Sequence, residues 1–274
     1  MEDVENLKIG IIGCGAIGSG VARAIHSGLH PRASLSAVYD SDPAKTRRLS
    51  ETLSAPSLAV DTLAELLSCS DLVVEAVNSP TTHELLLTIL HHKKHLLVMS
   101  VGQVFLHPEI LDAADTAGVS LLIPSGAVAG IDALKAAAQA GIDEIILTTY
   151  KPPQGLAGAP FIRDNNILLE NITEETVLFD GNAAEAVKAF PQNINVAATL
   201  ALATGCHDKL RIRIVTSPQL THNRHEVTAK GPFGEITTIT KNIPSPENPK
   251  TSYLAVLSGL VMLKSFCNTI QIGT

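Results

Sequence analysis

Residues 8–20 read KIGIIGCGAIGSG, and this stretch predicts the fold of the first half of the chain. An apolar run leads into glycines at positions 13, 15 and 18, and small and apolar residues at helical spacing follow. A strand, a tight turn and a helix in this order are typical of a dinucleotide-binding unit, whose helix N-terminus attracts phosphate. The candidate cofactor-binding residues in this turn are Gly13, Gly15, Ala16, Ile17 and Gly18.

An acidic residue, Asp40, follows the next expected strand, residues 34–39. It comes about 20 residues after Gly18, the offset at which a carboxylate meets the ribose hydroxyls of a dinucleotide. Asp40 could instead form a turn and a helix cap with the residues that follow it, and both roles could hold together. Because a carboxylate repels the 2′-phosphate of NADP, we expect NAD as the cofactor, although the basic residues within 45–48 leave NADP open.

The length and charge of the chain limit its fold and its partners. With 274 residues it suits two modest domains or one large one, and 45% hydrophobic residues suffice for a core. The net charge of −7 argues against a nucleic-acid partner. Apolar segments of membrane-spanning length are absent and the N-terminus is acidic, unlike a signal peptide. We therefore expect a cytoplasmic protein without a membrane partner.

Cysteine and histidine spacing does not predict a metal site. The four cysteines lack paired CxxC spacing, and we interpret them as small buried residues rather than disulfide or zinc ligands. His91 and His95 could share one face of a helix, but the neighbouring Lys93 and Lys94 favour a solvated cationic helix end. We expect no bound metal.

An alternation of strands and helices continues to about residue 124. Residues 71–77, DLVVEAV, are apolar and β-branched, as expected for a strand covered on both faces. Further strands are expected at 57–60, 95–100 and 119–124, with a glycine loop at 101–103. Ligands of such sheets bind at the carboxyl ends of the strands. Further cofactor-binding candidates at this edge are therefore Ala76, Asn78, Ser100 and Gly102.

A change of pattern at residues 125–131, SGAVAGI, marks a second region. Strand patterns occur at 144–150, 211–216, 225–230 and 235–240, the last two joined as a hairpin by residues 231–234. This predicts a mixed or antiparallel sheet with helices. We expect a loop at 242–250 and an apolar helix at 251–266 that packs on the first half. The expected domains are thus a dinucleotide-binding domain, 1–124 with 251–274, and a catalytic and dimerisation domain, 125–250.

The second region offers groups suited to acid–base chemistry and to substrate binding. Strand alternation directs His225 toward the covered face and leaves His222 in water or in a loop. An inward histidine is a candidate acid–base catalyst, although many such histidines only fill a core. Asn193 and Asn195 precede an apolar helix, where one would cap it and either could bind the cofactor or a carboxylate. Lys151 could bind an acidic substrate or lie on the surface.

The sequence resembles the L-aspartate dehydrogenase family along nearly its whole length. The resemblance rests on the motifs GCGAIG at 13–18, DLVVEA at 71–76, SVG at 100–102, PSGAVAGIDAL at 124–134, YKPP at 150–153, FPQNINVAATLALA at 190–203, NRHEV at 223–227 and IPSPENPKTSYLA at 243–255. It implies a Rossmann domain with a second α/β domain. It also implies His225 as the active-site histidine and cofactor contacts at Ala127 and at either Asn193 or Asn195. Ala129, where the family pattern suggests glycine, leaves that loop's shape open.

The resemblance further implies the reaction. The expected activity is oxidation of L-aspartate by NAD, or by NADP, to iminoaspartate and then to oxaloacetate and ammonia, with a role in nicotinamide-ring biosynthesis. Lys151, Asn193 and Asn195 are the candidate substrate ligands, and we expect a homodimer. Two alternatives are another two-domain amino-acid oxidoreductase, related to homoserine dehydrogenase or dihydrodipicolinate reductase, and a non-catalytic NAD sensor. The sensor would leave the second region's histidine and asparagines unexplained.

Overall fold

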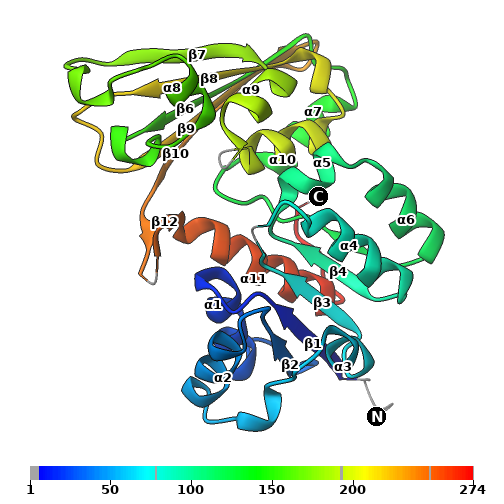
Figure 1. Cartoon of the computed structure of the whole chain (residues 1–274). Coiled ribbons are helices and arrows are strands. Elements are labelled where there is room, and N and C mark those ends of the chain that lie inside the picture. Colours follow the sequence, from blue (N-terminus) through cyan, green and yellow to red (C-terminus); the bar gives the residue numbers. More distant parts are fainter. Residues whose placement is uncertain (1–5, 78, 192–193, 247, 274) are drawn as a thin grey trace. The chain divides into compact units, whose positions relative to one another are not determined.

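The chain divides into two compact units, each with its own five-stranded sheet. The computed structural model describes residues 6–77, 79–191, 194–246 and 248–273 (Figure 1). Unit 1 comprises the described residues up to Pro124 together with Val256–Gln271. Unit 2 comprises Ser125–Ala255 and the described residues after 271.

Unit 1 holds an open parallel sheet with the strand order β2-β1-β3-β4-β5. Its strands are β1 (Leu7–Ile12), β2 (Ala33–Tyr39), β3 (Leu72–Glu75), β4 (His95–Val98) and β5 (Leu121–Leu122). Its helices are α1 (Ala16–His26), α2 (Pro43–Thr52), α3 (Leu63–Ser68), α4 (Thr82–His91), α5 (Val101–Leu106) and α6 (Glu109–Ala117), with a 3₁₀ turn, η1 (Pro56–Leu58). Because β2 and β3 flank β1 on opposite sides, the strand order reverses between β1 and β3.

Alternate residues of the unit 1 strands pack against helices on opposite faces of the sheet. Ile9 and Ile11 belong to one buried cluster with α1 and with Val256 and Leu263 of the last helix, α11 (Tyr253–Cys267). On the other face, a Cβ added at Gly10 would lie 2.9 Å from the Leu66 side chain of α3. Such burial on both faces explains why these strands are continuously apolar.

Two local expectations for unit 1 are wrong. Residues 57–60 form no ladder, because Pro56 begins η1 and only Ala59 bridges to β2. The glycine loop at 101–103 is instead the start of α5, where burial of Val101 and Val104 offsets the cost of one helical glycine. The strand expected at 95–100 is confirmed, because His95 begins β4 and lies outside the helix that ends at His91.

Unit 2 holds a mixed sheet with the strand order β10-β9-β6-β8-β7, in which only β6 and β8 are parallel. Its strands are β6 (Glu144–Lys151), β7 (Thr176–Asn182), β8 (Leu210–Thr216), β9 (Asn223–Gly231) and β10 (Gly234–Asn242). Its helices are α7 (Ile131–Ala138), α8 (Pro160–Asp164), α9 (Ala183–Ala189) and α10 (Asn195–Thr204), with 3₁₀ turns η2 (Pro153–Gly155), η3 (Leu169–Asn171) and η5 (His207–Lys209). The two sheets confirm the predicted fold class, and β9 and β10 form the predicted hairpin.

The expected loop at 242–250 contains two short strands, β11 (Pro244–Ser245) and β12 (Asn248–Ser252), which pair with each other. Proline is tolerated there because Pro244 begins its strand in an isolated two-stranded ribbon. Within the described ranges, every helix is too short or too polar to cross a membrane.

Candidate functional site

The three glycines after β1 differ in what surrounds them. Gly13 has a φ of 95°, and a Cβ there would lie 2.4 Å from the carbonyl oxygen of Ala76. A Cβ at Gly18 would lie 1.8 Å from the carbonyl oxygen of Gly13. A Cβ at Gly15, by contrast, would meet no other part of the described chain within 4 Å. Gly13 and Gly18 are therefore required by the fold, whereas Gly15 leaves open space beside the backbone.

Asp40 holds the glycine turn from the end of β2. One carboxylate oxygen accepts a hydrogen bond from the backbone N–H of Cys14 (2.8 Å), and the other accepts one from Asp42 (2.9 Å). Its side chain is 10% exposed, and the Lys45 ammonium lies 3.9 Å from one oxygen. Each carboxylate oxygen can accept a second bond, so these contacts are compatible with a ribose ligand. The helix cap is Asp42, which bonds to Ala44.

Glu75 is a polar site residue that the sequence analysis did not single out. It ends β3, is 0% exposed and accepts bonds from the Val77 N–H (2.5 Å), the Ser100 N–H (3.2 Å) and the Ser100 hydroxyl (2.6 Å). Burial raises the pKa of this carboxyl, and the Ser100 hydroxyl opposes the rise. The sequence does contain a sign of this residue, because a glutamate ends the otherwise apolar strand LVVE.

The unit 1 candidates lie at the carboxyl edge where the strand order reverses, as a dinucleotide site requires. Ala76 contacts the glycine turn through its backbone, and its N–H donates to Ile12. Ala16 and Ile17 open α1, while Ser100 precedes α5 and Gly102 lies in its first turn. The space beside Gly15, at the start of an 11-residue helix, fits an approaching pyrophosphate. The residues present therefore fit a pyridine nucleotide.

In unit 2, His225 lies on the covered face of the sheet. It is 6% exposed, and its Nδ1 lies 3.0 Å from the Thr149 hydroxyl of the adjacent strand, opposite it in register. Burial first, and then the charge of Lys151, lower the pKa of His225 to about 4. The imidazole is therefore neutral near pH 7, and its Nε2 can accept a proton if Nδ1–H donates to Thr149. The predicted inward position is confirmed, and His222 is exposed.

Lys151 ends β6 on the same face as Thr149, two residues along the strand. Its backbone carbonyl accepts a bond from the Thr216 hydroxyl (2.7 Å), which anchors the strand end. Burial lowers the pKa of its ammonium to about 8. Lys151 is thus a partly buried cation beside a neutral histidine, not an ordinary surface lysine.

The loop that carries Ala127 is fixed to β10. Asn242 donates to the Ala127 carbonyl (2.9 Å), Thr240 accepts from the Ala129 N–H (3.1 Å) and Thr238 donates to the Ala129 carbonyl (3.2 Å). Thr240 lies opposite His225 in the β9–β10 register. The structure therefore brings Ala127, His225, Thr149 and Lys151 into one part of unit 2.

The asparagine pair is described only in part. Asn195 is exposed and is the first residue of α10, whose cap is Ile194, so Asn195 is not the expected cap. Asn193 lies outside the described residues, as does Asn78 among the unit 1 candidates.

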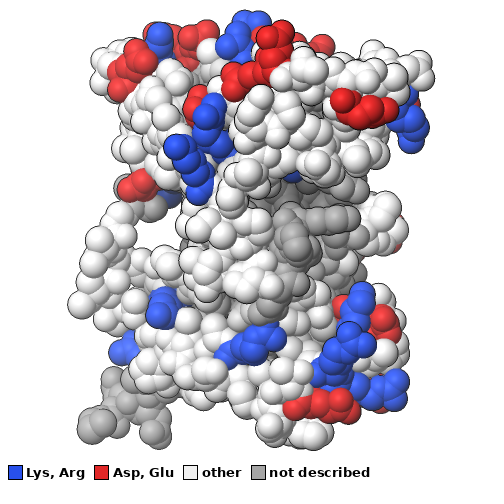
Figure 2. Space-filling model, turned by 90° about the vertical axis from the view of Figure 1, so that its left-hand side faces the viewer, with Lys and Arg blue, Asp and Glu red and all other residues white. Residues whose placement is uncertain are grey.

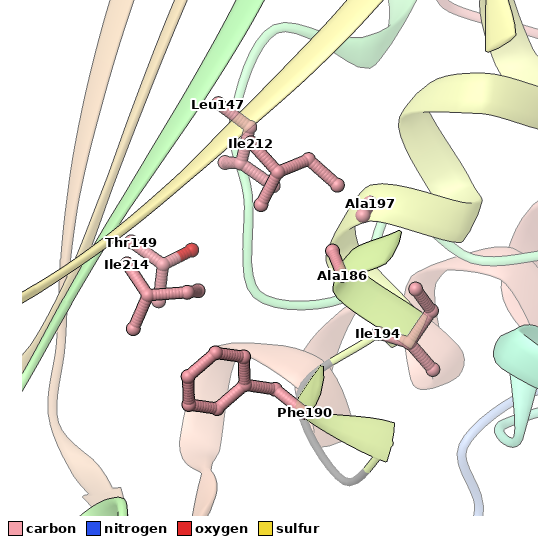
Figure 3. A pocket seen from close by; sticks show the side chains of 8 residues that line it. All are labelled: Leu147, Thr149, Ala186, Phe190, Ile194, Ala197, Ile212 and Ile214. Carbon is pink, nitrogen blue, oxygen red and sulfur yellow. The ribbon is translucent and has the colours of Figure 1, made fainter. Parts of the chain in front are cut away.

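A small apolar hollow lies on the same face of the sheet as His225. Figure 3 shows Leu147, Thr149, Ile212 and Ile214 on the sheet facing Phe190 and the helices α9 and α10. It is too apolar for a phosphate or a dicarboxylic acid. We therefore interpret it as a packing defect between the sheet and these helices.

Charged side chains of both signs are interspersed on the face drawn in Figure 2. Across the described ranges, no three histidine, cysteine or acidic side chains are grouped so that they could hold a metal.

Two family models match the chain. "Aspartate dehydrogenase, C-terminal" matches residues 132–266, and "Homoserine dehydrogenase, NAD binding domain" matches residues 13–124. L-Aspartate dehydrogenase of Methanococcoides burtonii is 44% identical over 272 residues, covering 98% of this chain and all of the relative. The enzyme of the same name from Methanosarcina barkeri is 45% identical over 271 residues, again covering 98% of this chain and 100% of the relative.

Solved structures share the fold. Aspartate dehydrogenase from Thermotoga maritima superposes with a TM-score of 0.74 at 24% identity, covering 97% of this chain and 99% of that one. Homoserine dehydrogenase from Thiobacillus denitrificans superposes with a TM-score of 0.60 at 15% identity, covering 95% of this chain and 73% of that one.

The different surroundings of Gly15 and Gly18 yield a test. Gly18→Ala should destabilise the protein by several kcal/mol, because its methyl overlaps the Gly13 carbonyl. Gly15→Ala should leave the melting temperature nearly unchanged but weaken NADH binding, because its methyl enters the space left for a pyrophosphate. Thermal unfolding and NADH fluorescence titration measure the two effects. If Gly15→Ala bound NADH as tightly as the unmodified protein, the proposal that this turn binds the pyrophosphate would be contradicted.

Proposed function

The chain belongs to the L-aspartate dehydrogenase family, and from this membership we propose that it catalyses oxidative deamination of L-aspartate. It is an oxidoreductase that uses a pyridine nucleotide and a small-molecule substrate. The substrate loses a hydride from Cα and a proton from its amine to give iminoaspartate. Water then converts the imine to oxaloacetate and ammonia. The observation that carries the proposal is 44% identity along 98% of the chain.

The bound nicotinamide supplies the hydride acceptor. In our proposal Gly13, Gly15 and the first turn of α1 bind the pyrophosphate, and Asp40 binds the adenosine ribose. Ala76, Ser100, Gly102, Ala127 and either Asn193 or Asn195 complete the proposed cofactor contacts.

NAD is the proposed cofactor in preference to NADP. The Asp40 carboxylate is 10% exposed and would face a 2′-phosphate with like charge. Lys45 lies 3.9 Å from Asp40 and would reduce this repulsion, so some use of NADP is expected. The ratio of kcat/KM for the two cofactors measures the preference.

His225 is the proposed acid–base group. A neutral imidazole can take the proton released by the substrate amine and can later activate the attacking water. The low pKa of His225 keeps it in this accepting form, and Thr149 fixes the orientation of its ring. The neighbouring Lys151 is the proposed partner of a substrate carboxylate, with Asn193 and Asn195 as further substrate contacts.

A homodimer is proposed through the face of the unit 2 sheet opposite His225. This face exposes Val177 and Ile239, each at 58%. The nearby ion pair Arg224–Glu226 supplies both signs of charge, which suits a self-complementary interface between two copies. Light scattering should report twice the mass of one chain, and Ile239→Lys should yield monomers. A monomeric native protein would contradict this proposal.

The imine product supports a proposed metabolic role. Iminoaspartate is the form of the product that can enter nicotinamide-ring biosynthesis before water consumes it. We propose that the enzyme serves this synthesis.

Replacement of His225 tests the reaction and the catalytic role together. His225→Ala should lower kcat by about 10²–10⁴-fold while NADH still binds. NADH formation from L-aspartate at alkaline pH gives the rate, and fluorescence titration gives NADH affinity. His222→Ala, which removes an exposed histidine of the same unit, is the matched control and should retain full activity. An unchanged rate in His225→Ala would reject the catalytic role. If the unmodified protein oxidised homoserine but not L-aspartate, a related oxidoreductase would be favoured instead.

The lowered pKa of Lys151 predicts a pH dependence of substrate binding. As pH rises through about 8, Lys151 loses its proton and can no longer pair with a carboxylate, so KM for L-aspartate should increase. Lys151→Arg stays charged and should keep a flat KM to higher pH, whereas Lys151→Gln should raise KM about tenfold or more at pH 7. A lowered kcat with unchanged KM in Lys151→Gln would instead make the lysine an acid–base group.

A further inference from the structure

Glu75 joins two loops at the edge of the unit 1 sheet. Its Oε1 accepts from Val77 in the loop after β3, and its Oε2 accepts from both the N–H and the hydroxyl of Ser100 after β4. Its own carbonyl also accepts from Met99 (3.0 Å). One fully buried side chain therefore ties together the ends of two adjacent strands.

The bonding pattern favours the ionised carboxylate. Each of the three side-chain contacts can come from a donor, two of them backbone N–H groups that cannot accept. Burial opposes ionisation, but donors to a carboxylate are among the strongest hydrogen bonds in proteins. An amide in this place would turn its NH₂ group toward at least one of these donors.

The strand order indicates which part of a cofactor these loops would meet. A dinucleotide crosses the sheet edge where the order reverses, between β1 and β3. Asp40 lies on the β2 side of this point, and Ser100 lies on the β4 side. With the adenosine half beside Asp40, the other half must extend toward the loops after β3 and β4.

We propose that Glu75 is a positioning residue for the nicotinamide half of the cofactor, because it fixes the loops after β3 and β4 in one arrangement. This inference rests on the proposed cofactor site. Its consequence is selective: loss of the carboxylate should harm binding of the nicotinamide half and spare the adenosine half.

Binding of NADH and of ADP-ribose to Glu75→Gln tests this selectivity. ADP-ribose keeps the adenosine half and the pyrophosphate but lacks nicotinamide. We expect Glu75→Gln to raise the Kd for NADH about tenfold or more and to change the Kd for ADP-ribose less than about twofold. If Glu75→Gln weakened the binding of both ligands equally, or weakened the binding of neither, the proposal would be overturned. If the unmodified protein bound neither ligand, the cofactor site itself would be rejected. That result differs from a failure of the Glu75 proposal alone.

A control and a second variant complete the experiment. Glu185→Gln removes an exposed carboxylate that accepts a backbone N–H at the start of α9, and it should change neither Kd. Ser100→Ala removes one donor to Glu75 without loss of the carboxylate. It should weaken NADH binding in the native background and have little further effect in Glu75→Gln. Equal effects in both backgrounds would show that Ser100 acts independently of Glu75. If Glu75→Gln does not fold, Ser100→Ala must still weaken NADH and spare ADP-ribose.

Discussion

The close approach of α1 to the end of β1 is the constraint on which the nucleotide half depends. The helix fits only because Gly18 lacks a Cβ, which would lie 1.8 Å from the Gly13 carbonyl oxygen. Gly13 in turn lies against Ala76, so the turn after β1 contacts the end of β3. Asp40 then bonds the Cys14 N–H from the end of β2. Three strand ends are thereby held around one turn, and Gly15 keeps the space that none of them fills.

Burial shifts the pKa values of the buried acid in unit 1 and of the buried bases in unit 2 in opposite directions. It raises the pKa of Glu75, where the charged form is the ionised acid, and lowers the pKa values of His225 and Lys151, where the charged form is protonated. The surroundings then decide the outcome. Donors around Glu75 oppose the effect of burial and favour its charge, whereas the charge of Lys151 adds to the effect of burial and favours a neutral His225 ring. Burial alone therefore favours the neutral form of all three groups, and only at Glu75 do hydrogen-bond donors oppose it.

Periodicity and glycine spacing predicted the sheets well because both depend on near neighbours in the chain. Strand alternation was enough to direct His225 inward, and the spacing from Gly18 to Asp40 identified a residue that does contact the turn. Prediction failed where partners are distant in sequence. The bond between Glu75 and Ser100 spans two strands, and the start of α5 depends on burial of Val101 and Val104, which the sequence pattern does not reveal.

The division of the chain also explains why its chemistry is harder to predict than its cofactor. A nucleotide turn serves many substrates, so it identifies a cofactor class and little else. In our proposal substrate choice comes from unit 2, where Thr238, Thr240 and Asn242 alternate along β10 and hold the loop of Ala127 opposite His225. These hydrogen bonds join residues more than 100 positions apart in the sequence. Each bond uses a polar side chain that, in the sequence, cannot be told from the usual polar residues of a strand. A short motif around His225 can therefore reveal a catalytic candidate, but the surface that would select its substrate exists only after the sheet has formed.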